Sequence, residues 1–234
     1  MKKYGEDKHY SKKRTYIRGA CRFDIINYLI EKNNYVNYLE IGVRVPGACF
    51  NRIIAKYKDG IDPKPLGSGE VNYPMTSDEF FSLIEHNKKY DIIFIDGLHL
   101  YNQVSRDIKN SLNHITDNGT IVLHDCNPIS KDRQTENYIQ GMMWNGTSWK
   151  AYAELRCLRE DLSMTVVDTD EGIGIIQRGN QKLWVDKFMP VKQSVTLDDR
   201  IFTYEYFDKN RKELLNLISV EEFERIYSNG RCIK

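Results

Sequence analysis

Residues 90–97, with the sequence YDIIFIDG, decide the fold class of this chain. The almost continuous apolar run is typical of a strand that is buried on both faces, as in parallel sheets covered by helices. Three more apolar runs end at an acidic residue close to Gly, Pro or Cys: residues 38–42 (YLEIG), 60–63 (GIDP) and 121–126 (IVLHDC). If these runs are neighbouring parallel strands, their carboxylates gather at one edge of the sheet, where open α/β folds bind ligands.

Helical patterns alternate with these strands. Apolar residues at helical spacing predict a helix over residues 21–32, and a stripe of Phe50, Ile53, Ile54 and Tyr57 predicts a second helix packed on the sheet. The remaining predicted elements are a strand at 61–62, a very short strand near 70–73, a helix opened by a capping box at 76–79, a helix over 104–115, a strand at 120–124 and a hairpin of 164–167 with 173–176. We therefore predict an α/β fold with a doubly wound, mostly parallel seven-stranded sheet and a terminal antiparallel hairpin.

The predicted organisation has three parts. Residues 1–20 are rich in Lys and Arg and form either a solvated flexible terminus or an arm that folds over an anionic ligand. Residues 21–178 form the main domain, in which the polar, irregular stretch 127–148 is expected to be a lid or binding loop. Residues 179–234 form an aromatic-rich C-terminal extension with a helix through Leu214, Leu215 and Leu217.

Composition excludes several classes of protein. Lys and Arg total 34 against 33 Asp and Glu, so the formal charge of +1 gives no general attraction to nucleic acid or acidic membranes. The five cysteines are odd in number and form no C-x-x-C pair, which argues against a disulfide framework and a thiolate zinc site. The polar N-terminus and the lack of a long apolar run lead us to expect a soluble cytoplasmic protein.

The turn after the first strand is suited to a nucleotide-like cofactor but departs from a dinucleotide fingerprint. Gly42 and Gly47 stand apart, with Arg44 and Pro46 between them. A pyrophosphate needs closely approaching backbone amides on glycines at a helix N-terminus. An NAD-dependent oxidoreductase or epimerase is therefore the disfavoured alternative.

With these strand ends, and above all FIDGLH at 94–99 and LHDCNP at 123–128, the chain resembles class I S-adenosylmethionine-dependent methyltransferases. More narrowly it resembles the branch with macrocin-type sugar O-methyltransferases and cephalosporin hydroxylase-like proteins. The resemblance covers roughly residues 20 to 178. It implies S-adenosylmethionine as the cofactor, with these candidate binding residues: Glu40, Gly42, Arg44, Asp62, Thr76, Ser77 and Asp96. Arg44 replaces the usual middle glycine of that family, and either Arg44 or Arg18 is expected to pair with the methionine carboxylate.

The same resemblance implies the catalytic residues. Metal-dependent relatives place acidic ligands at the positions of Asp96 and Asp125, and two hard oxygen ligands suit Mg²⁺. A histidine three residues after the first Asp is their general base, which here is His99. His124, beside Asp125, is a competing base and a further candidate metal ligand. Cys126 is a tempting nucleophile, but a small packing residue is the preferred interpretation.

These residues predict an O-methyltransferase acting on a hydroxyl of a small molecule. A saccharide acceptor is preferred, because of the resemblance and of aromatic residues such as Trp144 and Trp149 that could stack on sugar faces; a phenolic or catechol-like acceptor is the alternative. A non-catalytic partner subunit with the same fold also stays open. No nucleic-acid or membrane partner is expected, and a homo-oligomer is possible.

Overall fold

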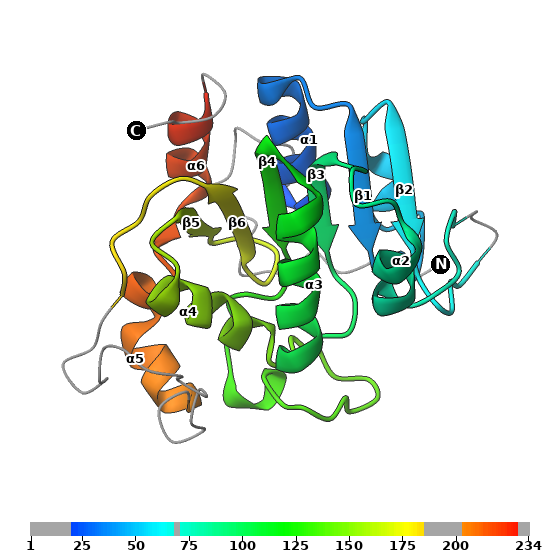
Figure 1. Cartoon of the computed structure of the whole chain (residues 1–234). Helices are drawn as coiled ribbons and strands as arrows, with labels where there is room; N and C mark the ends of the chain where they lie inside the picture. Colours follow the sequence, from blue (N-terminus) through cyan, green and yellow to red (C-terminus); the bar gives the residue numbers. More distant parts are fainter. Residues whose placement is uncertain (1–19, 68–70, 185–202, 229–234) are drawn as a thin grey trace.

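The computed structural model describes residues 20–67, 71–184 and 203–228. The elements are α1 (Arg22–Asn33), β1 (Asn37–Ile41), the 3₁₀ turn η2 (Phe50–Arg52), β2 (Tyr57–Ile61), α2 (Ser77–Leu83), β3 (Tyr90–Ile95), α3 (Tyr101–His114), β4 (Ile115–Leu123), the 3₁₀ turn η3 (Lys131–Arg133), α4 (Ser148–Leu158), β5 (Leu162–Val167), β6 (Ile173–Arg178), α5 (Tyr204–Leu214), β7 (Leu217–Ile218) and α6 (Val220–Tyr227). Figure 1 shows their arrangement around one central sheet. The basic arm predicted for residues 1–20 lies almost wholly outside the described residues.

The sheet has seven described strands in the order β2-β1-β3-β4-β6-β5-β7. Neighbouring strands from β2 to β4 pair in parallel, whereas β6 runs antiparallel to both β4 and β5. At the far edge, β7 pairs in parallel with β5. The predicted fold class, a mostly parallel sheet with an antiparallel hairpin, is confirmed.

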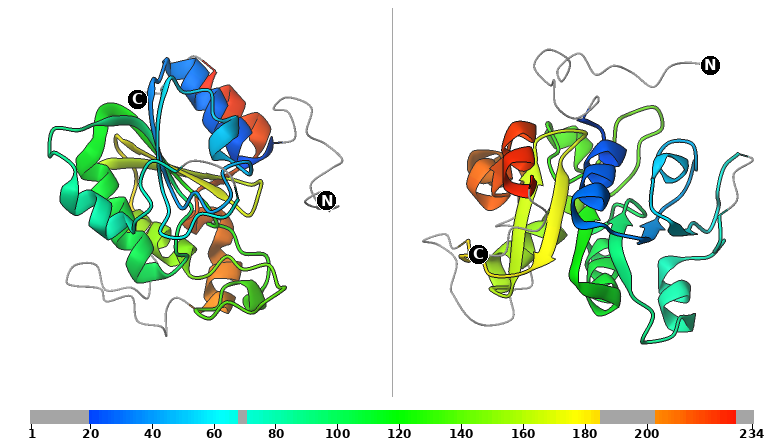
Figure 2. Two further views of the ribbon diagram at one scale, coloured as in Figure 1. Left: turned by 90° about the vertical axis from the view of Figure 1, so that its right-hand side faces the viewer. Right: turned by 90° about the horizontal axis from the view of Figure 1, so that it is seen from above.

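Helices cover both faces of the sheet. Along β3, Ile93 and Ile95 belong to the hydrophobic cluster that includes α3 and α4, and Ile92 and Phe94 belong to the cluster on the other face. Figure 2 shows α1 and α6 side by side on that second face, where the rings of Tyr28 and Phe223 lie 5.4 Å apart. Both faces of β3 are therefore buried, as its continuous apolar sequence predicted.

The prediction of a helix from Phe50 to Tyr57 is wrong. Only the 3₁₀ turn η2 forms, and the chain enters β2 at Tyr57, whose pairing with Asn37 opens the parallel ladder with β1. Ile54 and Tyr57 are more than half exposed, so only Phe50 and Ile53 of the stripe face the core. Tyr57, the last residue of the stripe, pairs with β1, so at this end a tertiary contact overrides the local pattern.

Two further predicted elements differ from the structure. The short strand expected near residues 70–73 is a single bridge between Tyr73 and Ile61. The C-terminal helix ends at Leu214 rather than continuing through Leu217, which starts β7 and extends the sheet instead.

The carboxyl ends of β1 and β3 come very close together. Gly42 has a φ of +99°, and a Cβ at this position would lie 2.1 Å from the carbonyl oxygen of Asp96. Only glycine fits both the conformation and the space. The residues that follow β1 and β3 are therefore held side by side.

No helix in the described ranges is long and apolar enough to span a membrane.

Candidate active site

Four of the predicted site residues meet at the carboxyl ends of β3 and β4. Asp96 follows β3, His124 and Asp125 follow β4, and His99 lies in the turn before α3. His99 Nδ1 lies 2.8 Å from Asp125 Oδ2, and His99 Nε2 lies 3.4 Å from Asp96 Oδ1. His124 Nδ1 lies 3.0 Å from Asp96 Oδ1 and 3.1 Å from Asp125 Oδ2. We call these four residues the Asp-His cluster.

The backbone at Asp125 is unusual. Its φ of +60° lies in the left-handed region, which costs a non-glycine residue about 1 to 3 kcal/mol. Hydrogen bonds on both sides hold the turn: His124 N donates to Ile95 O, and Cys126 N donates to Gly172 O. The surrounding structure thus supports a strained residue at the centre of the site.

Two charged residues outside the Asp-His cluster, which no sequence pattern indicated, contact it. Arg22, in the first turn of α1, lies 2.6 Å from Asp96 Oδ2 through Nη1 and 3.0 Å from Asp170 Oδ2 through Nε. Asp170 Oδ1 in turn lies 3.7 Å from His124 Nε2. Residues 22 and 170 are far apart in the sequence, and no motif links them, so only the folded chain brings them together.

The charged groups in this site shift one another's pKa values. Burial would lower the pKa of His99, yet Asp125 and Asp96 raise that pKa to about 10. The pKa of His124 is likewise raised well above its ordinary value, because Asp125 and Asp96 outweigh burial and the charge of Arg22. Conversely, the cations hold the pKa of both aspartates well below the ordinary value although burial opposes this. Each charged group in the cluster therefore favours the charged form of its neighbours.

The Asp-His cluster suits a divalent cation. Ligand atoms of Asp96, His124 and Asp125 all lie within 4.8 Å of one another. The buried nitrogens of His99 (Nδ1) and His124 (Nδ1 and Nε2) make no hydrogen bond within the described chain despite their short distances to carboxylates. Imidazole nitrogens and carboxylate oxygens that converge without forming hydrogen bonds are suited to bind a cation together, because metal ligands must be deprotonated. Two carboxylates and an imidazole suit ions such as Mg²⁺ or Mn²⁺.

Three of the predicted cofactor residues lie at the same edge of the sheet. Glu40 is almost fully buried and accepts a hydrogen bond from the Tyr38 hydroxyl. Burial and the nearby charge of Asp96 raise the pKa of Glu40 to about 7 although Tyr38 opposes the shift. Gly42 follows Glu40 at the close approach described above. Asp62 follows β2, and its Oδ1 accepts a hydrogen bond from Lys64 N.

The structure does not bring the other three cofactor candidates into the Asp-His cluster. Arg44 is exposed on the loop after β1. Thr76 caps α2 in a reciprocal capping box with Glu79. The Ser77 hydroxyl lies 2.6 Å from Asp107 Oδ1 and joins α2 to α3. The capping box is thus confirmed as a helix start, and a role in cofactor binding stays a prediction for these residues.

The predicted lid, residues 127–148, is irregular apart from η3 and lies against the site. The Trp144 ring stacks on His99, with ring centres 5.1 Å apart and planes 9° apart. Trp149 instead lies in the core, where it packs on Phe207 of α5. Cys126 is fully buried, and burial raises the pKa of its thiol, in agreement with a packing role.

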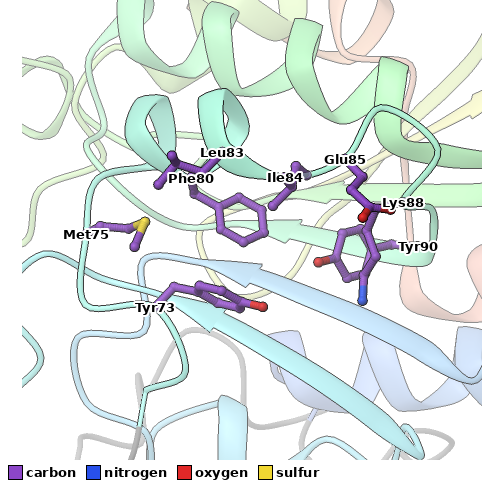
Figure 3. Close-up of a pocket in the computed structure, with 8 residues that line it drawn as sticks. All are labelled: Tyr73, Met75, Phe80, Leu83, Ile84, Glu85, Lys88 and Tyr90. Atoms are coloured by element: carbon purple, nitrogen blue, oxygen red, sulfur yellow. The ribbon is translucent and has the colours of Figure 1, made fainter.

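A separate cavity lies between α2 and the sheet near β2 (Figure 3). It has a volume of about 320 Å³ and shares no residue with the Asp-His cluster. Its lining is mostly apolar and aromatic: Tyr73, Met75, Phe80, Leu83, Ile84, Glu85, Lys88 and Tyr90.

Comparison with known proteins identifies the fold family. Residues 66–126 match a family model described as a methyltransferase domain, and this range contains Asp96, His99 and Asp125. The matched range supports a class I methyltransferase fold for this chain. The match favours this interpretation over a dinucleotide-dependent enzyme. No curated protein matches the chain significantly.

Solved structures of methyltransferases resemble this chain in fold. The SAH-bound methyltransferase PaMTH1 of Podospora anserina is 13% identical, with a TM-score of 0.50 over 68% of this chain and 78% of that one. An O-methyltransferase of Bacillus cereus in complex with SAH is 14% identical, with a TM-score of 0.48 over 65% of this chain and 78% of that one. At this level of identity the likeness concerns the fold alone.

Proposed function

We propose that the methyltransferase domain transfers a methyl group from S-adenosylmethionine to a hydroxyl of a small molecule, assisted by a divalent cation such as Mg²⁺. One observation carries the proposal: the Asp-His cluster lies at the same sheet edge as Glu40, Gly42 and Asp62. An acid-base site thus adjoins residues suited to an adenosyl cofactor. The family match to residues 66–126 supports the same activity.

The cofactor residues have distinct parts in this proposal. The turn at Gly42, next to the buried carboxyl of Glu40, would hold the methionine half of the cofactor. Asp62 Oδ1 is held by Lys64 N, which fixes the carboxylate at the end of β2. A carboxylate suits the ribose diol because it can accept two hydrogen bonds. The bound cofactor supplies the electrophilic methyl group.

Proton transfer is assigned to His99. In the described state its charge is stabilised by Asp96 and Asp125. Asp96, Asp125 and His124 would hold the cation, which lowers the pKa of the acceptor hydroxyl and orients it. His99 Nδ1 lies 2.8 Å from Asp125 Oδ2, which would hold the ring in place, and His99 Nε2 would accept the hydroxyl proton.

A saccharide is the acceptor class that we propose. The Trp144 ring lies over His99, and Tyr138 packs against Trp144 with ring centres 5.8 Å apart. Tyr138 is 58% exposed, so an aromatic surface continues from the site to the outside of the lid. Apolar faces of sugar rings stack on such side chains.

The test is to measure SAH binding by calorimetry and SAH production from S-adenosylmethionine with a panel of hydroxyl-bearing sugars and phenols, with and without Mg²⁺. We expect SAH binding and acceptor-dependent turnover that needs the cation. Binding of SAH without turnover on any acceptor would instead support a non-catalytic subunit. Absence of SAH binding would refute the proposal.

A further inference from the structure

Asn145, in the lid, is the residue that ties the lid to the Asp-His cluster. Its side chain is 1% exposed, and its Nδ2 lies 2.7 Å from Asp125 Oδ1 and 3.1 Å from Glu171 Oε2. Two acceptor-only carboxylates face the amide, so its NH₂ group must point toward them. The orientation of the amide therefore follows from its partners.

This contact sets the orientation of the Asp125 carboxylate. Asp125 Oδ1 is bonded by Asn145, which leaves Oδ2 facing His99 and His124 at 2.8 and 3.1 Å. Asp125 lies past the end of β4 with a left-handed backbone, so the regular ladder does not fix its side chain. Asn145 performs that task from a distant segment.

Several contacts hold Asn145 in place. The backbone N–H groups of Asn145 and Gly146 donate to Arg133 O, and Arg133 Nη1 pairs with Glu171 Oε1 at 2.7 Å. Gly146 has a φ of +58°, and a Cβ there would lie 2.0 Å from His99 O. Thr147 N donates to the same His99 oxygen. The end of the lid is therefore packed directly on the turn that carries His99.

The oxygen of the Asn145 amide has no hydrogen-bond partner among the described residues. Asn145 Oδ1 is buried and accepts no hydrogen bond within the described chain. Leaving a buried acceptor without a hydrogen bond destabilises the fold, so its presence beside a candidate cation site points to a donor that arrives with a ligand. Water on the cation and the acceptor hydroxyl are donors of this kind.

We propose that Asn145 is a positioning residue for cation binding. It holds Asp125 Oδ1 so that Oδ2 faces the cation, and its own Oδ1 accepts a hydrogen bond from a group bound there. The inference rests on the cation-assisted part of the proposed function. It adds to that function a direct contact between the lid and the Asp125 carboxylate of the cation site.

The experiment measures Mn²⁺ affinity of the full chain by electron paramagnetic resonance, with SAH affinity by calorimetry as a second readout. Asn145→Ala removes both amide groups, and Asn145→Leu removes them while it keeps the branched shape of the side chain. Asn137→Ala, at an exposed position of the same lid, is the matched control. Loss of Mn²⁺ binding in Asp125→Ala would show that the measured binding occurs at the Asp-His cluster.

We expect Asn145→Ala and Asn145→Leu each to weaken Mn²⁺ binding at least tenfold, with SAH affinity within twofold of the wild type and Asn137→Ala unchanged. An Asn145→Leu variant of similar shape that folds, as judged by circular dichroism, keeps the test valid if the alanine variant does not. Wild-type Mn²⁺ affinity in the Asn145 variants, or no Mn²⁺ affinity in the wild type, would overturn the inference. A wild type that binds Mn²⁺ through Asp125 but does not bind SAH would refute the methyl-transfer proposal and leave the role of Asn145 intact.

Discussion

Replacing Glu40 with Gln should stabilise the fold in a pH-dependent way. Glu40 is 3% exposed, and burial together with the charge of Asp96 raises its pKa from 4.5 to about 7. This difference corresponds to about 3 kcal/mol, at 1.36 kcal/mol for each pKa unit. Below pH 4.5 the carboxyl is protonated in both folded and unfolded states, so it costs nothing. Between pH 4.5 and 7 the unfolded state loses its proton first, and the full cost is present above pH 7.

The assay is urea unfolding of the wild type and Glu40→Gln from pH 4 to 8.5. We expect the two free energies of unfolding to agree near pH 4 and to differ by about 3 kcal/mol at pH 8 in favour of the variant. Glu31→Gln, on the exposed side of α1, is the control and should show no such trend. A difference that does not change with pH, or a variant that is less stable at pH 8, would refute the reasoning. The same variant should bind SAH more weakly than the wild type, because the carboxyl beside Gly42 is lost.

Three other predictions concern His99, the divalent cation and Arg22. His99→Ala should lower kcat by about 10²- to 10⁴-fold with unchanged SAH affinity, and full turnover in this variant would exclude His99 as the base. A chelator should abolish turnover, and added Mg²⁺ should restore it; full activity in chelator would leave Asp96 and Asp125 with acceptor-binding or structural roles. Arg22→Met should reduce the free energy of unfolding by about 3 kcal/mol, because Asp96 and Asp170 lose their shared cation. An unchanged urea midpoint would show that this pairing adds nothing to stability.

The strand ends could be predicted from the sequence because one physical pattern marks them. Continuous apolar runs identify buried parallel strands, and an acidic residue directly after such a run must lie at the carboxyl edge of the sheet. Asp96 and Asp125 were found in this way. His99, three residues after Asp96, is indicated instead by the resemblance to metal-dependent methyltransferases.

The remaining parts of the site depend on contacts between distant segments. Arg22, Asp170 and Asn145 come from a helix start, a hairpin turn and a lid, and none has a local pattern that predicts its neighbours. The prediction of a helix from Phe50 to Tyr57 is wrong for a related reason, because its last residue, Tyr57, pairs with β1. Helical spacing describes a side-chain stripe, but it cannot reveal that the backbone is needed by a neighbouring strand.

A crystal structure with SAH and Mn²⁺ tests the central claim most directly. We predict an anomalous Mn²⁺ peak bound by Asp96, His124 and Asp125, with the sulfur of SAH next to it and the ribose on Asp62. An anomalous peak elsewhere, or SAH bound away from the carboxyl ends of β1 and β3, would contradict the account.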